Sequence, residues 1–249
     1  MKQTIIFTDL DGTLLNKKYS YSSASQALTL IKKQKIPLVI CTSKTRAEIE
    51  YYRKKLRNKE PFISGNGGGI YIPKKYFNFK FRYNKTKGKY YIIELGTELD
   101  KLNKFMNKVR KKHNIKFKTF IELSTKQVSK DTGLPLRLTK LARKRDYDLP
   151  IKILDKNKSK IMNILKSEAK KSGFNFIQGT RYCHITGKND KGKAVKILIS
   201  FYKRKYKNIK SIALGDAAND LPMLKVVNKG YLIKRGPIDW NKIVKKEIK

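Results

Sequence analysis

Two kinds of segment, each with its own pattern of apolar and polar positions, alternate along the chain. Short apolar runs rich in β-branched residues are typical of buried strands. These runs occupy residues 3–7, 36–41, 61–63, 70–72 and 210–214. Between them, apolar residues recur at helical spacing after capping-box pairs, Ser23 with Gln26 and Thr45 with Glu48. Strands that alternate with helices predict a parallel sheet with right-handed crossovers, so the pattern predicts an α/β fold.

The middle of the chain departs from this rhythm. It contains strand-like segments and two long helices with polar faces, near residues 97–112 and 157–172. Gly173 stands where the C-cap of the second helix is expected. Because the parallel pattern resumes afterwards, we expect a second domain inserted into the first. The expected domains are a Rossmann-like parallel-sheet core, residues 1–82 plus 189–249, and an inserted α/β cap, residues 83–188.

Four polar clusters interrupt the core part of this pattern. They are Asp9 with Asp11; Thr42, Ser43 and Lys44; Lys191; and Asp216, Asn219 and Asp220. The first, second and fourth clusters directly follow predicted strands, and the third begins a predicted helix. In open α/β sheets, ligands bind at the carboxyl ends of the strands. We therefore expect these clusters to form one site.

The residue types in these clusters indicate a phosphate site. Two neighbouring carboxylates, Asp9 and Asp11, raise each other's pKa unless a cation lies between them. Carboxylate oxygens from Asp9, Asp11 and Asp216 suit Mg²⁺, which prefers oxygen ligands. The hydroxyl of Thr42, or that of Ser43 in its place, can donate a hydrogen bond to a phosphoryl oxygen, and Lys191 adds a fixed positive charge.

The formal charge of +41, from 60 basic and 19 acidic residues, makes nucleic-acid binding the first alternative. The basic residues are mostly lysine, however, and they are about equally dense in both expected domains. A docking surface would concentrate them and favour arginine, whose planar fork suits phosphates. We therefore interpret the excess as a chain-wide lysine bias that attracts anionic small molecules, and we do not expect nucleic acid to be the partner.

The sequence also indicates where the protein acts. No apolar stretch approaches the ~20 residues that a membrane span needs, and the N-terminus does not have the pattern of a signal peptide. The two cysteines, Cys41 and Cys183, are too few and too far apart for a disulfide framework. We expect a cytoplasmic protein with no membrane partner.

Five segments carry a resemblance to a known family. They are CTSKTRAEIEYYRKKL (41–56), PFISGNGGGIYIP (61–73), LARKRDYDLPI (141–151), RYCHITGKNDKGKAV (181–195) and GDAANDLPML (215–224). The four polar clusters resemble the four motifs of the haloacid dehalogenase superfamily, and the insert resembles its type-IIB cap. The longer segments resemble the mannosyl-3-phosphoglycerate phosphatases, and this resemblance covers nearly the whole chain.

The resemblance implies a Mg²⁺-dependent phosphatase that forms an aspartyl-phosphate intermediate. Asp9 would be the nucleophile. Asp11 would protonate the leaving alkoxide and then activate water. The expected catalytic residues are Asp9, Asp11, Thr42 and Lys191. The expected metal-site residues are Asp9, Asp11, Asp216 and Asp220, of which Asp220 would support the metal from behind its direct ligands or through water.

The resemblance implies mannosyl-3-phosphoglycerate as the substrate, with mannosylglycerate and phosphate as products. Two alternatives remain: glucosyl-3-phosphoglycerate or another sugar phosphate as the substrate, and a basic nucleic-acid-binding protein on a hydrolase scaffold. Since the core motifs already bind the phosphate, we expect an arginine of the insert to bind the carboxylate of the substrate. The candidate substrate-binding residues are Ser43, Lys44, Asn66, Arg143, Arg145, Arg181, His184 and Asn219. Gly65 departs from the family pattern, in which Glu or Ser is expected.

Overall fold

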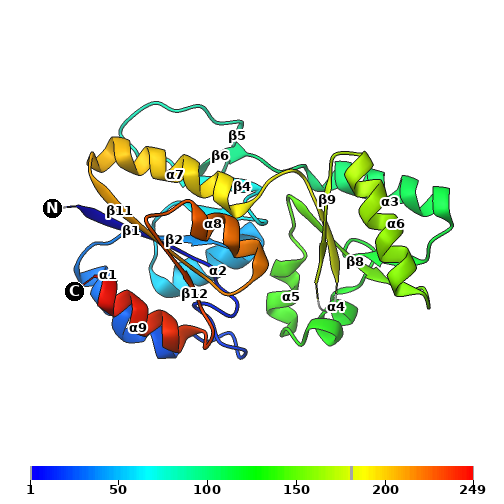
Figure 1. Ribbon diagram of the computed structural model, residues 1–249, viewed down its shortest axis with the longest axis horizontal. Helices are drawn as coiled ribbons and strands as arrows, with labels where there is room; N and C mark the ends of the chain where they lie inside the picture. The colour runs from blue at the N-terminus through cyan, green and yellow to red at the C-terminus, as the bar shows by residue number, and fades with distance from the viewer. Residues whose placement is uncertain (1, 180–181, 249) are drawn as a thin grey trace.

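The computed structural model describes residues 2–179 and 182–248, and within them the chain forms two sheets (Figure 1). The larger sheet has eight strands in the order β12-β11-β1-β2-β3-β4-β6-β5. Their bounds are β1 (Gln3–Thr8), β2 (Leu38–Cys41), β3 (Phe62–Ser64), β4 (Gly69–Pro73), β5 (Lys85–Lys87), β6 (Tyr90–Glu94), β11 (Ile209–Gly215) and β12 (Lys229–Leu232). Strands β12 to β3 are parallel, whereas β4, β6 and β5 continue the sheet in antiparallel pairs.

Helices cover both faces of the larger sheet. The helices are α1 (Ser25–Lys33), α2 (Arg46–Leu56) and α9 (Pro237–Glu247) on one face, and α7 (Lys191–Tyr206) and α8 (Leu221–Lys225) on the other. Two short 3₁₀ turns, Ser22–Ala24 and Ala218–Asp220, precede α1 and α8. Side chains of a strand alternate between the faces, so Ile6 packs with α9 while Phe7 packs with α7. This burial on both faces explains why β1 and β2 read as continuous apolar runs.

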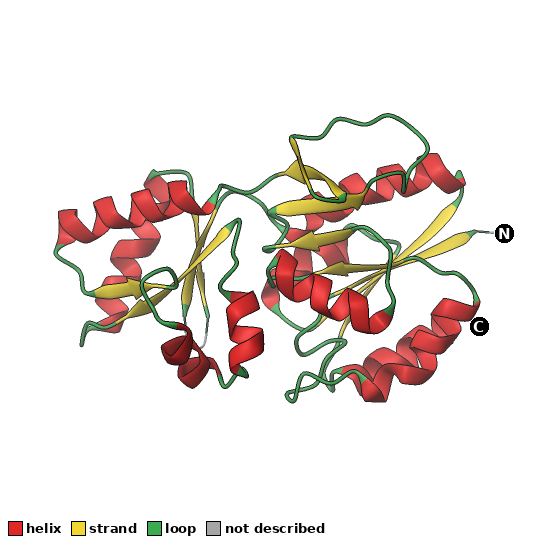
Figure 2. Cartoon of the chain, turned by 180° about the vertical axis from the view of Figure 1, so that it is seen from behind, coloured by secondary structure: helices red, strands yellow, loops and turns green. Residues whose placement is uncertain are grey.

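The second sheet is antiparallel and has its own helices (Figure 2). Its strands, in the order β7-β8-β10-β9, are β7 (Phe117–Thr119), β8 (Asp148–Ile153), β10 (Cys183–Thr186) and β9 (Asn175–Gln178). The helices α3 (Leu99–His113) and α6 (Lys158–Lys171) pack on one face and form a separate hydrophobic core with the strands. The short helices α4 (Thr125–Thr132) and α5 (Leu136–Ala142) lie on the side that faces the larger sheet.

This architecture confirms the predicted fold class, a Rossmann-like parallel-sheet core with an inserted α/β cap. The strand pairing favours a later start for the cap than the expected residue 83. Strands β5 and β6 pair with β4 in the larger sheet, and Ile92 belongs to the core on one of its faces. Apolar alternation in this stretch identifies a strand but cannot say which sheet it joins. We propose that the cap spans residues 96–188.

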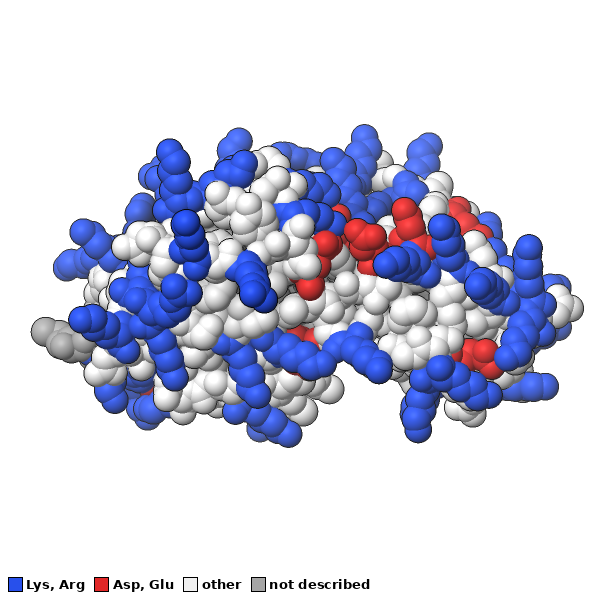
Figure 3. Space-filling view, turned by 90° about the horizontal axis from the view of Figure 1, so that it is seen from above, with Lys and Arg blue, Asp and Glu red and all other residues white. Residues whose placement is uncertain are grey.

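Two surface properties bear on the partners of the protein. In the described part of the chain, no helix is both long and apolar enough to cross a membrane. Lysine and arginine side chains are spread over both domains in the view of Figure 3, as the even density along the sequence led us to expect.

Candidate active site

The expected site residues follow three adjacent parallel strands. Asp9 follows β1, Thr42 follows β2, and Asp216 follows β11. The backbone extends the sheet a little further at this edge, since Asp9 N donates to Leu214 O at 3.0 Å and Thr42 N donates to Ile63 O at 3.1 Å. Parallel strands end at the same edge of a sheet, so all three residues lie at one edge of the larger sheet.

An acidic cluster of Asp9, Asp216 and Asp220 forms the centre of this edge. One carboxylate oxygen from each residue lies within 4.8 Å of the others. Thr13 Oγ1 donates to Asp216 Oδ1 at 2.8 Å, and Asp220 Oδ2 accepts from the backbone N–H of Asp216 and Ala217 at 2.9 and 3.0 Å. Burial is the main reason that the pKa of Asp216 rises to about 6, and the charges of Asp9 and Asp220 raise it further.

Lys191 supplies a cation to the acidic cluster. Its side chain is fully buried, and Nζ lies 2.5 Å from Asp220 Oδ1 and 3.2 Å from Asp9 Oδ1. Burial by itself lowers the pKa of Lys191, but the charges of Asp9 and Asp220 outweigh it, so the pKa lies above its usual value. Three carboxylates then face one ammonium, and the cluster retains an excess of negative charge.

The cluster therefore fits a hard divalent cation. Its three members offer oxygen ligands alone, the donor set that Mg²⁺ prefers. Asp9 Oδ1 is buried and makes no hydrogen bond of good geometry, although Lys191 Nζ lies within ion-pair distance of it. A buried acceptor without a hydrogen bond destabilises the folded protein unless another group binds it. The expected ligands Asp9, Asp216 and Asp220 are thus brought together.

Asp11 does not join the acidic cluster through its side chain. Its carboxylate is half-exposed and lies 2.9 Å from Lys44 Nζ, which also lies 3.3 Å from Glu48 Oε1. Burial lowers the pKa of Lys44, but Glu48 and Asp11 more than compensate, and the pKa lies above its usual value. The expectation that the Asp11 carboxylate is a metal ligand is therefore not supported by its position, because it is turned toward this lysine.

The remaining core candidates hold the loops of the site together. Thr42 is buried, and its Oγ1 accepts a hydrogen bond from Lys44 N at 3.4 Å. Asn66 N donates to Thr42 O at 3.1 Å, and Asn66 Oδ1 accepts from Asn219 Nδ2 at 2.9 Å. Ser43 lines a narrow cavity under the cap. Asn66 and Asn219 thus bind each other and link two loops of the core.

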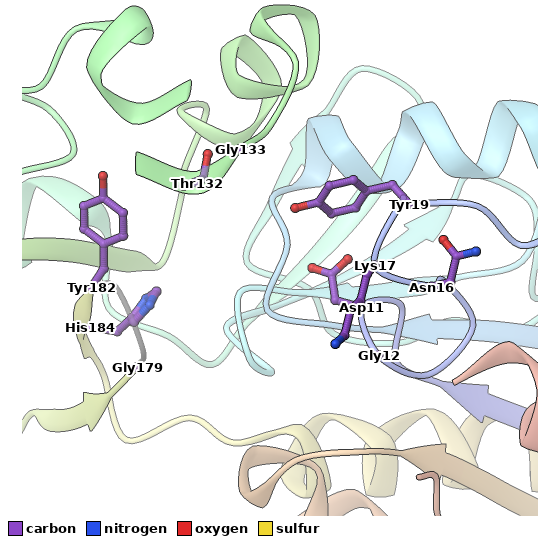
Figure 4. A pocket seen from close by; sticks show the side chains of 10 residues that line it. All are labelled: Asp11, Gly12, Asn16, Lys17, Tyr19, Thr132, Gly133, Gly179, Tyr182 and His184. Carbon is purple, nitrogen blue, oxygen red and sulfur yellow. The ribbon is translucent and has the colours of Figure 1, made fainter. Parts of the chain in front are cut away.

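A cavity of about 840 Å³ lies between the core and the cap, and we call it the interdomain cavity. Its lining residues are Asp11, Gly12, Asn16, Lys17, Tyr19, Thr132, Gly133, Gly179, Tyr182 and His184 (Figure 4). Figure 4 shows Asp11 and Tyr19 on the core side and His184 and Tyr182 on the cap side. Sequence reasoning missed Asn16, Lys17, Tyr19 and Tyr182. Tyr19 has a left-handed φ of 59°, a conformation that the sequence does not signal for tyrosine.

The cap candidates separate into two groups. His184 Nδ1 lies 3.0 Å from both carboxylate oxygens of Asp148, and the Arg145 guanidinium binds the same carboxylate. Arg143 instead donates to Thr125 Oγ1 at 3.0 Å and to Ile121 O within the cap. The expected role of Arg143 in substrate binding is therefore not supported, because its guanidinium joins segments of the cap. Arg181, the remaining candidate, lies outside the described residues.

Tyr147 joins the cap to the core. Its ring is buried in one of the core's own hydrophobic clusters, and its hydroxyl donates to Glu94 Oε1 at 2.6 Å. A Cβ atom on Gly68 would lie 2.4 Å from Tyr147 Cβ, one on Gly69 would lie 2.6 Å from its Cε2, and one on Gly96 would lie 2.9 Å from its Cβ. We call these three glycines the glycine cradle.

The backbone conformation accounts for the departure at Gly65. This residue has a φ of +58°, a left-handed value that favours glycine. A Cβ atom there would lie 3.4 Å from Tyr147 Cβ, which is an ordinary contact distance. The left-handed φ, rather than a clash with Tyr147, therefore explains the glycine at this position.

Fold and site together define a hydrolase with an inserted cap, and comparison with known proteins identifies its family. The model of the haloacid dehalogenase-like hydrolases matches residues 6–249, so the chain belongs to this family. A glucosyl-3-phosphoglycerate/mannosyl-3-phosphoglycerate phosphatase of Methanococcoides burtonii is 41% identical, over 96% of this chain and 95% of that protein. A mannosyl-3-phosphoglycerate phosphatase of Pyrococcus horikoshii is 37% identical, over 92% of this chain and 90% of its own length.

A solved structure from Thermotoga maritima has the same fold. It aligns with a TM-score of 0.68 and 18% identity, over 99% of this chain and 97% of that chain. Identity this low bears on the fold alone. The family model and the curated relatives confirm the predicted family resemblance, and the protein is a phosphatase.

Proposed function

We propose that the protein hydrolyses mannosyl-3-phosphoglycerate to mannosylglycerate and phosphate in a Mg²⁺-dependent reaction. The observation that carries this proposal is the identity of 37–41% to phosphatases of this name over at least 92% of the chain. The interdomain cavity supports it. About 840 Å³ is ample for a substrate with a sugar and a glycerate group beside the phosphate.

In the first half of the proposed reaction, a carboxylate oxygen of Asp9 attacks the phosphorus atom. The bond between phosphorus and the glycerate oxygen breaks, and this oxygen takes a proton from the Asp11 carboxyl group. The position of Asp11 suits the task, because its half-exposed carboxylate lines the cavity in which the leaving alcohol would lie. The product of this half is an aspartyl-phosphate.

In the second half, Asp11 accepts a proton from a water molecule, whose oxygen attacks the same phosphorus. The bond from phosphorus to Asp9 breaks, which releases phosphate and restores the free carboxylate. Thr42 and Lys191 would bind the phosphoryl oxygens while charge develops on them. Asp9, Asp216 and Asp220 would hold Mg²⁺, and the bound ion would neutralise charge between the carboxylates and the phosphate.

Glucosyl-3-phosphoglycerate is the second candidate substrate. Relatives at 41% and 40% identity carry both sugars in their names. The two substrates differ at one hydroxyl of the sugar, so an enzyme with a roomy cavity can accept both.

A phosphate-release assay tests the proposal. The purified protein is incubated with both glycosyl phosphoglycerates, with sugar phosphates such as glucose 6-phosphate, and with p-nitrophenyl phosphate, in EDTA or with added Mg²⁺. We expect the highest kcat/KM with a glycosyl phosphoglycerate, no turnover in EDTA and recovery with Mg²⁺. A higher kcat/KM with a simple sugar phosphate would overturn the substrate proposal, and full activity in EDTA would overturn the metal proposal.

A further inference from the structure

The segment Arg145–Asp148 connects the core to the cap side of the cavity. Its two middle residues are fixed to the core. Asp146 Oδ2 accepts from Tyr71 OH at 3.0 Å, and Tyr147 sits in the glycine cradle. The two outer residues, Arg145 and Asp148, line the narrow cavity between the domains. The position of Asp148 is therefore set by the core contacts of its neighbours together with its own pairing opposite Thr186 in the cap sheet.

Asp148 is a buried carboxylate with two basic partners. It is 1% exposed, and it binds His184 Nδ1 and the Arg145 guanidinium. Burial raises the pKa of Asp148, but the charges of His184 and Arg145 outweigh this effect, and the pKa lies below its usual value. Asp148 is thus ionised and can only accept hydrogen bonds.

The ionised carboxylate requires a hydrogen on Nδ1 of His184, in either protonation state of the ring. Because Asp148 can only accept, Nδ1 must donate, which holds the ring in one orientation. The other nitrogen, Nε2, then lies on the side of Gly179, since a Cβ atom on Gly179 would be 3.6 Å from it. Both His184 and Gly179 line the interdomain cavity, opposite Asp11 (Figure 4).

We propose that Asp148 is a positioning residue that fixes the orientation of His184 and keeps a hydrogen on its Nδ1, so that Nε2 of His184 hydrogen-bonds the sugar–glycerate part of the substrate. This inference rests on the proposed function only in the identity of the substrate. A carboxylate behind a histidine orients the ring and strengthens its outward nitrogen, an arrangement whose loss in metal sites costs about 10–100-fold in affinity or activity.

A double-mutant cycle tests the proposal. Asp148→Asn, His184→Ala and the combined variant are assayed with the glycosyl phosphoglycerate and with p-nitrophenyl phosphate, which lacks the sugar–glycerate part. We expect each single change to lower kcat/KM for the larger substrate about tenfold or more, mainly through KM. Asp148→Asn should add little in the His184→Ala background, because its effect passes through the histidine. The small ester should lose less than about threefold.

The cap offers a matched control. Glu168 Oε1, on α6, lies 3.3 Å from His113 Nε2 and 3.1 Å from Lys112 Nζ, both on α3. These two helices face away from the core. Glu168→Gln and His113→Ala therefore disrupt a similar carboxylate–histidine pair outside the cavity, and they should leave both activities unchanged. Unfolding midpoints in urea, measured for all variants, detect any loss of the folded cap.

Two results would overturn the inference. One is an equal loss with both substrates, which would make Asp148 a residue of the fold or of the phosphate site. The other is additivity in the cycle, which would mean that Asp148 acts independently of His184. If the wild-type protein hydrolyses no glycosyl phosphoglycerate, the proposed substrate is wrong. The cycle is then run with the sugar phosphate that gives the highest kcat/KM, and the same two results decide.

Discussion

The Lys44 ammonium lies 2.9 Å from the Asp11 carboxylate, although the two residues follow different strands. Asp9 has its own cation, since Lys191 Nζ lies 3.2 Å from its Oδ1. Two aspartates with one residue between them therefore face separate ammonium groups. This arrangement limits the repulsion between them, and it leaves Asp9 in the acidic cluster while Asp11 faces the interdomain cavity.

Replacing the nucleophile should remove activity but not the fold. We expect Asp9→Asn to lower kcat by about a thousandfold or more, because an amide cannot attack phosphorus. The measurement is phosphate release, accompanied by urea unfolding to show that the variant is folded. Asp239→Asn, which alters a surface carboxylate paired with Arg235, serves as the control and should retain activity. Near-normal turnover by Asp9→Asn would remove Asp9 as the nucleophile.

The buried lysine should matter for stability as well as for catalysis. Lys191→Ala leaves Asp9 and Asp220 buried without their cation, a loss that typically costs about 3–5 kcal/mol. We expect the free energy of unfolding in urea, measured without Mg²⁺, to fall by that order. The control is Lys196→Ala, an exposed lysine on the same helix. An unchanged midpoint for Lys191→Ala would mean that the acidic cluster does not need this ammonium.

The glycine cradle predicts a clash that one further substitution relieves. Gly68→Ala places a Cβ atom 2.4 Å from Tyr147 Cβ, and overpacking of this kind costs about 1–3 kcal/mol. We expect a lower urea midpoint and a higher KM for the glycosyl phosphoglycerate. In a Tyr147→Gly background, which removes this Cβ atom, the cost of Gly68→Ala should largely disappear. An undiminished cost there would show that the glycine serves the core loop alone.

Glu247 should contribute to stability in a pH-dependent way. Burial raises its pKa, but bonds from Lys210, Tyr231 and Lys229 outweigh this effect and lower it to about 2 from its usual 4.5. The stabilisation is therefore full above pH 4.5 and is lost as the pH falls toward 2. When the pH falls from 7 to 3, the free energy of unfolding of the wild type should decrease by about 1–3 kcal/mol more than that of Glu247→Gln.

Urea unfolding at the two pH values measures this difference. Glu98→Gln, at an exposed carboxylate, is the control and should lose as much stability as the wild type on acidification. If Glu247→Gln and the wild type lose the same amount, the contacts of Glu247 do not contribute to acid sensitivity.

Some features could be predicted from sequence because they depend on local rules. Strands β1, β2 and β11 are apolar runs, and a residue that follows a parallel strand lies at a known edge of the sheet. Asp9, Thr42 and Asp216 could therefore be placed together without coordinates. The capping box of Thr45 and Glu48 was predicted from the spacing of the two residues, and both of its hydrogen bonds form at the start of α2.

Other features depended on packing between distant segments. The stretch Lys85–Glu94 has the alternation of a strand, but pairing with β4 decides that it joins the larger sheet. Arg143 and Arg145 are near neighbours of the same residue type, and only their partners separate them. Arg143 binds within the cap, whereas Arg145 binds the buried Asp148.

The sequence by itself determined the α/β core, the inserted cap and the acidic residues at the strand ends, because periodicity and strand-end position follow from the backbone. The phosphatase family came from the resemblance of its motif segments to known proteins. The tertiary structure decided which side chains face the interdomain cavity. It turned Asp11 toward Lys44, seated Tyr147 among three glycines and placed Asp148 behind His184. These contacts join residues far apart in the chain, and close packing in three dimensions, rather than local preference, selects them.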